Sequence, residues 1–296
     1  MTVGAVLRLV RPPNVFTAFA DAMAGLLVLW GIGLRVPDRA CAVILASGCL
    51  YLAGIVLNDV FDREIDARER PRRPIPSGEV SVAFAAALGF GLLASGVAIA
   101  AWIGRSPGLV AAALATCILV YDVWAKHTRI GPLVMGSCRG LDVALAISTG
   151  LALDAPWPPI AVAGPIVLAL YVTGLTYIAR DEVDGNTTRR ARTGLGFLAL
   201  LAAGVVIALV VSPGLPRSGL AWAWVALALG LGWRNWAPVW HRHDGPSTGR
   251  AIGGGIVLIP VIDAAIVAVA GCPFWAVGVV SLIVPALILK QFFSPT

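Results

Sequence analysis

Charged residues are scarce in this chain of 296 residues, because only 13% are Asp, Glu, Lys or Arg while 58% are apolar. So low a charge content excludes an ordinary soluble domain and a solvated disordered chain. The mean hydropathy of +0.87 instead indicates a protein whose solvent is lipid. We therefore expect an all-α, polytopic membrane protein.

Cysteine and histidine are also rare, with five and three residues. The cysteines lie in or beside apolar segments without short paired spacings, so we expect neither a disulfide framework nor a cysteine-ligated metal. His241 and His243 flank Arg242 in a polar loop, where we expect a solvated surface. Because no soluble region, linker or low-complexity tract interrupts the chain, we expect one transmembrane domain over residues 1–296.

Apolar runs near the roughly 17 to 25 residues that cross a bilayer recur along the chain. They fall at 14–34, 40–57, 81–103, 108–124, 131–153, 159–178, 194–212, 218–236, 251–270 and 274–290. The last run is short and follows its predecessor after only Gly271-Cys272-Pro273. The pattern therefore leaves nine or ten spans open.

Acidic residues gather at the end of the second run, where an unpaired carboxylate would be costly in lipid. On a helix Asn58, Asp62 and Asp66 share one face, and Asp59 lies three residues before Asp62. Like charges this close repel, so we expect a cation or cationic side chains among them. Mg²⁺ takes one or two carboxylates and fills its octahedron with water and phosphate oxygens. This face predicts half of a Mg²⁺-diphosphate site, the alternative being a solvated helix end balanced by nearby arginines.

A second acidic cluster follows the sixth run, about 120 residues downstream of the first. Its Asp181 and Asp184 are three residues apart and share a helical face, which permits a second metal site. The chain thus repeats its own design.

The segment after the first cluster, residues 70–78, is basic and contains three prolines. Proline forces this segment out of the helix. We expect the guanidinium groups of Arg70, Arg72 and Arg73 to lie over the acidic face, where arginine would match phosphate oxygens in a bidentate fork. A basic loop alone is more often a topology signal or a lipid-headgroup contact, but the adjacent acids favour a cover for bound diphosphate.

Lys and Arg are distributed unevenly between the two sides of the predicted spans. The outer loops hold only Arg35, Arg39, Arg105 and Arg217. By the positive-inside rule both acidic clusters face the cytoplasm, and we expect a multi-pass protein of the cytoplasmic membrane. Much of the net charge of +6 is therefore a topology signal, with no indication of nucleic-acid binding.

Together these segments resemble the signature of the UbiA superfamily of intramembrane prenyltransferases, of the 4-hydroxybenzoate polyprenyltransferase type. The matching motifs are Asn58-Asp59-x-x-Asp62-x-x-x-Asp66 and Arg70-Pro71-x-x-Pro74-x-Pro76-Ser77-Gly78. The similarity covers nearly the whole chain, from Arg11-Pro12 through Tyr121 and Lys126 to the second acidic motif. Within the superfamily, residues 56–62, 73–78 and 138–141 are most similar to the branch called EboC.

The resemblance implies two four-helix halves, at about 1–124 and 131–236, around a central cavity capped by the acidic loops. It also implies two Mg²⁺ ions that bridge the diphosphate of a polyisoprenyl donor to Asn58, Asp59, Asp62 and Asp66 and to Asp181 and Asp184. The catalytic residues it implies are Asp62, Asp66, Asp181, Asp184, Tyr121 and Lys126. The diphosphate-binding residues it implies are Arg70, Arg72, Arg73 and Lys126.

The implied chemistry begins when the allylic C–O bond ionises and the electron pair leaves with the diphosphate. The cavity must then keep the carbocation from water until an acceptor attacks it. Tyr121 would face the cation with its ring or hydroxyl. Two alternatives stay open: a terpene cyclase on the same scaffold, which needs no second substrate, and a transporter or lipid-binding protein that uses the duplicated halves.

Four charged residues fall inside predicted spans: Asp21, Arg139, Asp142 and Asp263. Each would cost roughly 2.5 kcal/mol or more if unpaired, so they should face the cavity or one another. Arg139 and Asp142 are three residues apart and either pair together or bind the acceptor with Asp21 and Asn14. We expect Asp263 to be a structural partner. The acceptor and the donor length stay open, although a carboxylate acceptor would favour Arg139 as its partner.

Overall fold

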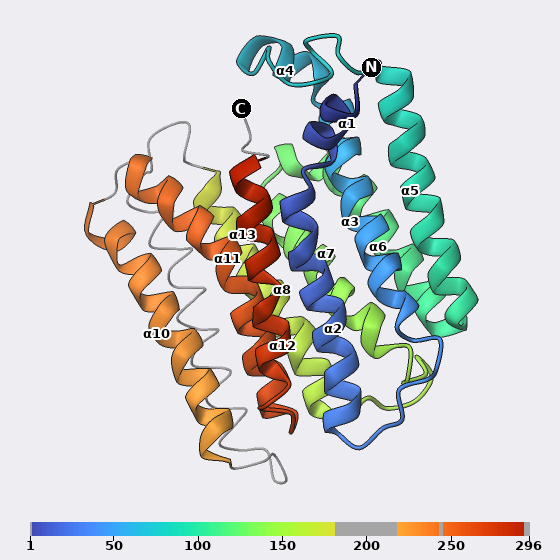
Figure 1. Cartoon of the computed structure of the whole chain (residues 1–296), viewed down its shortest axis with the longest axis vertical. Helices are drawn as coiled ribbons and strands as arrows, with labels where there is room; N and C mark the ends of the chain where they lie inside the picture. Colours follow the sequence, from blue (N-terminus) through green and yellow to red (C-terminus); the bar gives the residue numbers. More distant parts are fainter. Residues whose placement is uncertain (1, 181–217, 243–244, 293–296) are drawn as a thin grey trace.

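The computed structural model describes residues 2–180, 218–242 and 245–292, and all regular structure in these ranges is helical. The all-α expectation is therefore confirmed for the described chain. The long helices run side by side in one bundle (Figure 1). The predicted span 194–212 and the acidic residues Asp181 and Asp184 lie outside the described residues.

The N-terminal part of the bundle contains four long helices that coincide with the first four predicted spans. They are α2 (Val15–Gly31), α3 (Ala42–Phe61), α5 (Val82–Ile103) and α6 (Arg105–Val123). Shorter elements lie at one end of these helices: α1 (Val3–Val10), η1 (Pro12–Asn14), α4 (Arg63–Glu69) and η2 (Ala125–His127). Figure 1 shows α1 and α4 at the same end of the bundle, which we call the motif end.

The C-terminal part also follows the predicted runs. Its helices are α7 (Gly131–Ile147), α8 (Pro159–Ala179), α10 (Gly219–Arg242), α11 (Gly245–Val269), α12 (Ala276–Ser281) and α13 (Ile283–Phe292). The last run is thus broken into α12 and α13. Pro285 gives a physical reason, because it has no N–H to donate to the carbonyl of Ser281.

Six helical segments of the described chain are long and apolar enough to cross a membrane. They are Val3–Gly31, Ala42–Phe61, Val82–Ile103, Arg105–Val123, Pro159–Ala179 and Ser247–Val269. Helix α7 is shorter, with 17 residues, and contains Arg139 and Asp142. Helices long and apolar enough to span a membrane therefore both precede and follow α7 in the chain.

Glycine lets α7 approach its neighbours closely. A Cβ at Gly136 would lie 2.1 Å from Thr173 Oγ1 of α8, and a Cβ at Gly25 of α2 would lie 2.6 Å from Ala146 Cβ of α7. No side chain fits at either contact, so the helix backbones meet through small residues, as is usual in membrane bundles. Gly25 lies one turn after Asp21, and this approach brings Asp21 within reach of α7.

Candidate functional site

The first acidic motif lies where the chain changes direction. Helix α3 ends at Phe61, Asp62 has φ −87° and ψ 3°, and α4 then turns away across the motif end (Figure 1). The backbone bonds from Asp62 N–H to Asn58 O (2.9 Å) and from Asp66 N–H to Asp62 O (2.8 Å) continue through the bend. The predicted helical face is therefore bent at Asp62 rather than straight.

Two carboxylates of the motif are held by arginines from elsewhere in the chain. Arg11 donates through one nitrogen to both oxygens of Asp59, at 2.7 and 2.8 Å. Arg73 donates to Asp59 Oδ1 at 3.1 Å and to Asp66 Oδ2 at 2.5 Å. Both acids are 2% exposed, so the two guanidinium groups offset the cost of burying them.

Lysine and asparagine complete the arrangement. Lys126 Nζ lies 2.6 Å from Asp62 Oδ1, and η2 places this lysine just after α6. Asn58 Nδ2 donates to Asp122 Oδ1 at 3.1 Å, while Asp122 Oδ2 is buried without a hydrogen bond. We call this group the mouth: Asn58, Asp59, Asp62, Asp66 and Asp122 with Arg11, Arg73 and Lys126.

The proline-containing loop positions Arg73 through its own backbone. Val80 N–H donates to Pro74 O at 2.9 Å, and Gly78 adopts φ +76°, which glycine reaches without strain. Ile75 and Val80 are buried in an apolar cluster with residues of α1, α3 and α5. The loop therefore leaves the helix, as its prolines predict, and folds back so that Arg73 meets the acids.

Arg11 adopts a strained backbone conformation. Its φ of +46° is the only positive value at a non-glycine residue of the described chain, and such a position costs on the order of 1–3 kcal/mol. Arg11 caps α1 and precedes Pro12, so the turn between α1 and α2 depends on it. The same turn carries the guanidinium to Asp59.

The donor set of the mouth suits Mg²⁺ in kind, because it consists of carboxylate and amide oxygens. The described residues contain no group of three or more His, Cys, Asp or Glu side chains arranged to hold a metal ion. Cationic side chains occupy the carboxylates, which is one of the two possibilities that the acid spacing predicts. Mg²⁺ needs only one or two protein carboxylates beside phosphate. The residues therefore fit the ion if the arginine and lysine side chains leave the carboxylates and pair with the bound diphosphate instead.

The other predicted diphosphate ligands differ in position. Arg70 Nη1 lies 3.9 Å from Asp66 Oδ1 and is half exposed, whereas Arg72 is exposed. Tyr121 is partly buried on the last turn of α6, directly before Asp122. Asn14 in η1 is exposed, and its carbonyl accepts a hydrogen bond from Thr17 at 2.8 Å.

Three residues of this region were not predicted as site residues. Arg11 and Asp122 belong to the mouth, and Arg180 donates to the carbonyl of Lys126. Asp122 had a usable signal, because it is an acid near the end of an apolar run, four residues before Lys126. Arg11 belongs to the Arg11-Pro12 pair that carries part of the resemblance, but nothing in its segment indicates its partner Asp59, which lies 48 residues away.

The charged residues inside the bundle form a second group, which we call the interior cluster: Asp21, Arg139, Asp142 and Asp263. Arg139 Nη2 lies 2.8 Å from Asp21 Oδ2, so Arg139 pairs with α2 and the alternative of a pair with Asp142 is wrong. Ser47 Oγ donates to Asp142 Oδ2 at 2.8 Å. Asp21 and Asp263 are fully buried, and their carboxyl groups interact with each other.

The helical bundle, with acids and bases converging at one end, is that of a multi-pass membrane protein with a charged cluster at its motif end. A model of the UbiA prenyltransferase family matches residues 18–252. The chain therefore belongs to the UbiA prenyltransferase family and is a multi-pass membrane enzyme of that prenyltransferase type.

Individual relatives agree with this placement. The digeranylgeranylglyceryl phosphate synthase of Methanoculleus marisnigri is 33% identical over 202 residues, which cover 65% of this chain and 68% of the relative. The structure of a UbiA homologue from Aeropyrum pernix matches 94% of this chain and 98% of its own, at 17% identity and TM-score 0.67. A UbiA homologue from Archaeoglobus fulgidus bound to GPP and Mg²⁺ matches 86% and 99%, at 16% identity and TM-score 0.60.

Proposed function

We propose that the protein transfers a prenyl group from a polyisoprenyl diphosphate to a small lipophilic acceptor within the membrane, in a Mg²⁺-dependent reaction. The observation that carries this proposal is the mouth, where three buried or partly buried acids meet Arg11, Arg73 and Lys126 beside an apolar bundle. Such a set can exchange its internal pairs for pairs with a metal ion and a diphosphate.

The proposed metal ligands are Asn58, Asp59, Asp62 and Asp66, together with Asp181 and Asp184 outside the described residues. Bound Mg²⁺ would neutralise the charge that grows on the departing diphosphate. Arg73 and Lys126 would turn from their carboxylate partners to phosphate oxygens, with Arg70 and Arg72 as outer contacts. The structural match to the homologue bound to GPP and Mg²⁺ supports this arrangement.

The chain's own groups then govern the reaction. The allylic C–O bond breaks and its electron pair leaves with the diphosphate, which the cations of the mouth stabilise. Tyr121, near the mouth on α6, would face the carbocation. The surrounding apolar helices exclude water until an acceptor atom forms the new bond and releases its proton.

The interior cluster indicates which chemical class of acceptor the protein prefers. Three carboxylates there surround one guanidinium, and Asp21 already holds Arg139 at 2.8 Å. An acceptor carboxylate would have to share the cluster's one guanidinium with three carboxyl groups, so the cluster favours a hydroxyl-bearing acceptor over an aromatic acid. The relatives named digeranylgeranylglyceryl phosphate synthase carry a glyceryl group in that name, which is consistent with a hydroxyl acceptor.

We further propose that residues 1–296 form one domain with ten spans, in which α12 and α13 make the broken tenth. The halves at about 1–124 and 131–236 would enclose the cavity, with both acidic motifs at its cytoplasmic end. The uneven distribution of Lys and Arg supports this orientation. Placement in the EboC-like branch stays a prediction.

The test uses the purified full chain in nanodiscs with Mg²⁺ and radiolabelled geranylgeranyl diphosphate. It compares incubations without acceptor, with aromatic acids, and with hydroxyl-bearing glycerol lipids. We expect label transfer to a hydroxyl acceptor that is lost on EDTA addition and in Asp62→Ala. Asp38→Ala is the matched control, because Asp38 is exposed at the opposite end of α2 and α3.

Different outcomes separate the proposal from its alternatives. A cyclic hydrocarbon formed without acceptor would indicate a cyclase. Transfer by Asp62→Ala at the rate of the unmodified protein would contradict the metal-diphosphate assignment. Transfer to aromatic acids alone would overturn the acceptor preference and leave prenyl transfer intact.

A further inference from the structure

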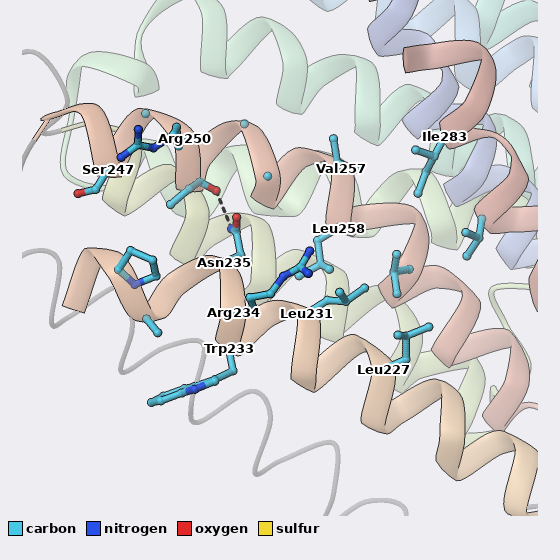
Figure 2. A pocket seen from close by; sticks show the side chains of 18 of the residues that line it. Leu227, Leu231, Trp233, Arg234, Asn235, Ser247, Arg250, Val257, Leu258 and Ile283 are labelled. Carbon is cyan, nitrogen blue, oxygen red and sulfur yellow. Dashed lines mark hydrogen bonds between the residues drawn. The ribbon is translucent and has the colours of Figure 1, made fainter. Parts of the chain in front are cut away.

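A groove of about 1480 Å³ lies between α10, α11 and the α12–α13 segment, away from the mouth. This volume exceeds the roughly 300–1,000 Å³ of ordinary small-molecule pockets. Figure 2 shows Leu231, Leu258 and Arg234 reaching into the space between α10 and α11. None of the groove's lining residues belongs to the mouth or to the interior cluster.

The groove has an apolar wall with basic side chains spread along it, since Figure 2 shows Arg234 beside Leu258 and Arg250 farther along α11, beside Ser247. Its apolar wall includes Leu227, Leu231, Val257, Leu258, Val261, Val280 and Ile283. The charged side chains that line it are Arg234, Arg250 and Lys290, and its described lining contains no acidic residue. None of these three cations takes part in an ion pair within the described chain. The groove therefore offers uncompensated positive charge next to an apolar channel.

The dimensions of the groove match one leaflet of a bilayer. At about 1.5 Å per residue, Arg250 and Val261 of α11 are about 16 Å apart along the helix axis, and Val280 and Lys290 are separated by about 15 Å. Half of the roughly 30 Å hydrocarbon core is about 15 Å. Arg250 lies in the first two turns of α11 and Lys290 near the end of α13, and these two helix ends lie toward the motif end (Figure 1). A molecule seated here would place its charge at that membrane surface and its chain alongside the apolar wall.

A hydrogen bond and a close approach join α10 and α11 beside the groove. Asn235 Nδ2 of α10 donates to Ala251 O of α11 at 2.7 Å (Figure 2). A Cβ at Gly254 would lie 2.1 Å from Asn235 Oδ1, so the helices touch there. A Cβ at Gly253 would meet no described atom within 4 Å. Gly253 thus marks open space in the wall.

We infer that this groove binds an anionic phospholipid of the surrounding membrane, with the phosphate among the basic side chains of the lining and an acyl chain along α11. Basic pockets between transmembrane helices at a membrane surface recognise such headgroups. The amphiphilic shape and leaflet length fit a lipid better than a protein segment. This site is separate from the prenyl diphosphate site and does not depend on the proposed reaction.

The test measures thermal unfolding of the delipidated full chain in detergent after addition of dioleoyl phosphatidylglycerol. Dioleoyl phosphatidylcholine serves as the probe with a zwitterionic, net-neutral headgroup, and inorganic phosphate serves as the probe without an acyl chain. We expect phosphatidylglycerol to raise the unfolding temperature by about 3 °C or more above either probe. The double variant Arg234→Gln/Arg250→Gln should weaken the affinity for phosphatidylglycerol by about tenfold or more.

Matched variants separate a site from general charge or folding effects. Arg68→Gln removes an exposed arginine at the same end of the bundle, outside the groove, and should keep the full shift. Gly253→Phe should fill the groove and abolish the shift, whereas Gly91→Phe on α5, also in open space, should not. The inference is overturned if the double variant and Gly253→Phe both keep the shift, or if phosphatidylcholine or phosphate alone produces it in the unmodified protein.

Discussion

The mouth and the interior cluster both contain buried acids, but their charge balance differs. At the mouth Asp59, Asp62 and Asp66 pair with three cations and Asp122 accepts from Asn58, whereas in the interior three acids meet Arg139 alone. Balanced pairs at a helix end can be exchanged for a charged ligand at small cost. Solvent does not reach the excess of acids inside the bundle, so the stability of this region depends on Arg139, its one cation. The two regions should therefore respond oppositely to substitution, the mouth in activity and the interior in stability.

The largest effect is expected at the mouth. Asp62→Ala should lower turnover by about 1000-fold or more, equivalent to ~4 kcal/mol, because it removes a proposed metal ligand at the reacting diphosphate. The free energy of unfolding should fall by about 2 kcal/mol, less than expected in the interior, because Lys126 is only 10% exposed and loses its partner but lies near the bundle end. A loss of stability in proportion to the loss of turnover would remove the distinction from the interior cluster.

The interior should show the reverse pattern. Arg139→Gln leaves three buried carboxylates without a cation and should destabilise the protein by about 3 kcal/mol. Asp263→Asn removes one acid from the excess around Arg139 and keeps a side chain of the same shape, so it should cost less than about 1 kcal/mol or raise stability. Thermal unfolding in one detergent compares the two, and equal destabilisation by both would contradict the acid-excess interpretation.

Two neighbouring arginines sharpen the comparison within the mouth. Arg73→Gln should raise the KM for the prenyl diphosphate about tenfold, because Arg73 is already seated between Asp59 and Asp66. Arg72→Gln is the matched control, since Arg72 is exposed, and we expect a change of about threefold or less. Steady-state kinetics with varied donor measures both, and an equal rise would show that the loop acts only through its total charge.

The smallest effect is expected at Asp122. Asp122→Asn keeps an oxygen that can accept from Asn58 and removes one negative charge beside Lys126. Turnover should fall about threefold while stability is unchanged or slightly higher, because the carboxylate oxygen without a partner is replaced by a neutral amide. A loss as large as that of Asp62→Ala would instead make Asp122 a direct ligand.

Much of the fold could be predicted from local patterns. The runs that became α2, α3, α5, α6 and α8 are recognisable because each helix satisfies its backbone internally and needs only apolar side chains in lipid. The bend at Asp62 and the break between α12 and α13 are harder to predict from sequence, because the chain can take several directions after a proline or a polar helix end. The spacing of Arg139 and Asp142 left a pair between them as one of two alternatives, because three residues allow a contact, but tertiary packing selected Asp21 as the partner of Arg139.

By itself the sequence determined the class of the protein, its apolar spans and its acidic and arginine motifs. These follow from composition and short spacings, which are local properties of the chain. Only the tertiary structure decided which base meets which acid. The partners Arg11 with Asp59 and Arg139 with Asp21 are 48 and 118 residues apart in sequence. Their approach depends on the strained turn at Arg11 and the contact of α2 with α7 at Gly25, because ion pairs form between surfaces that packing brings together.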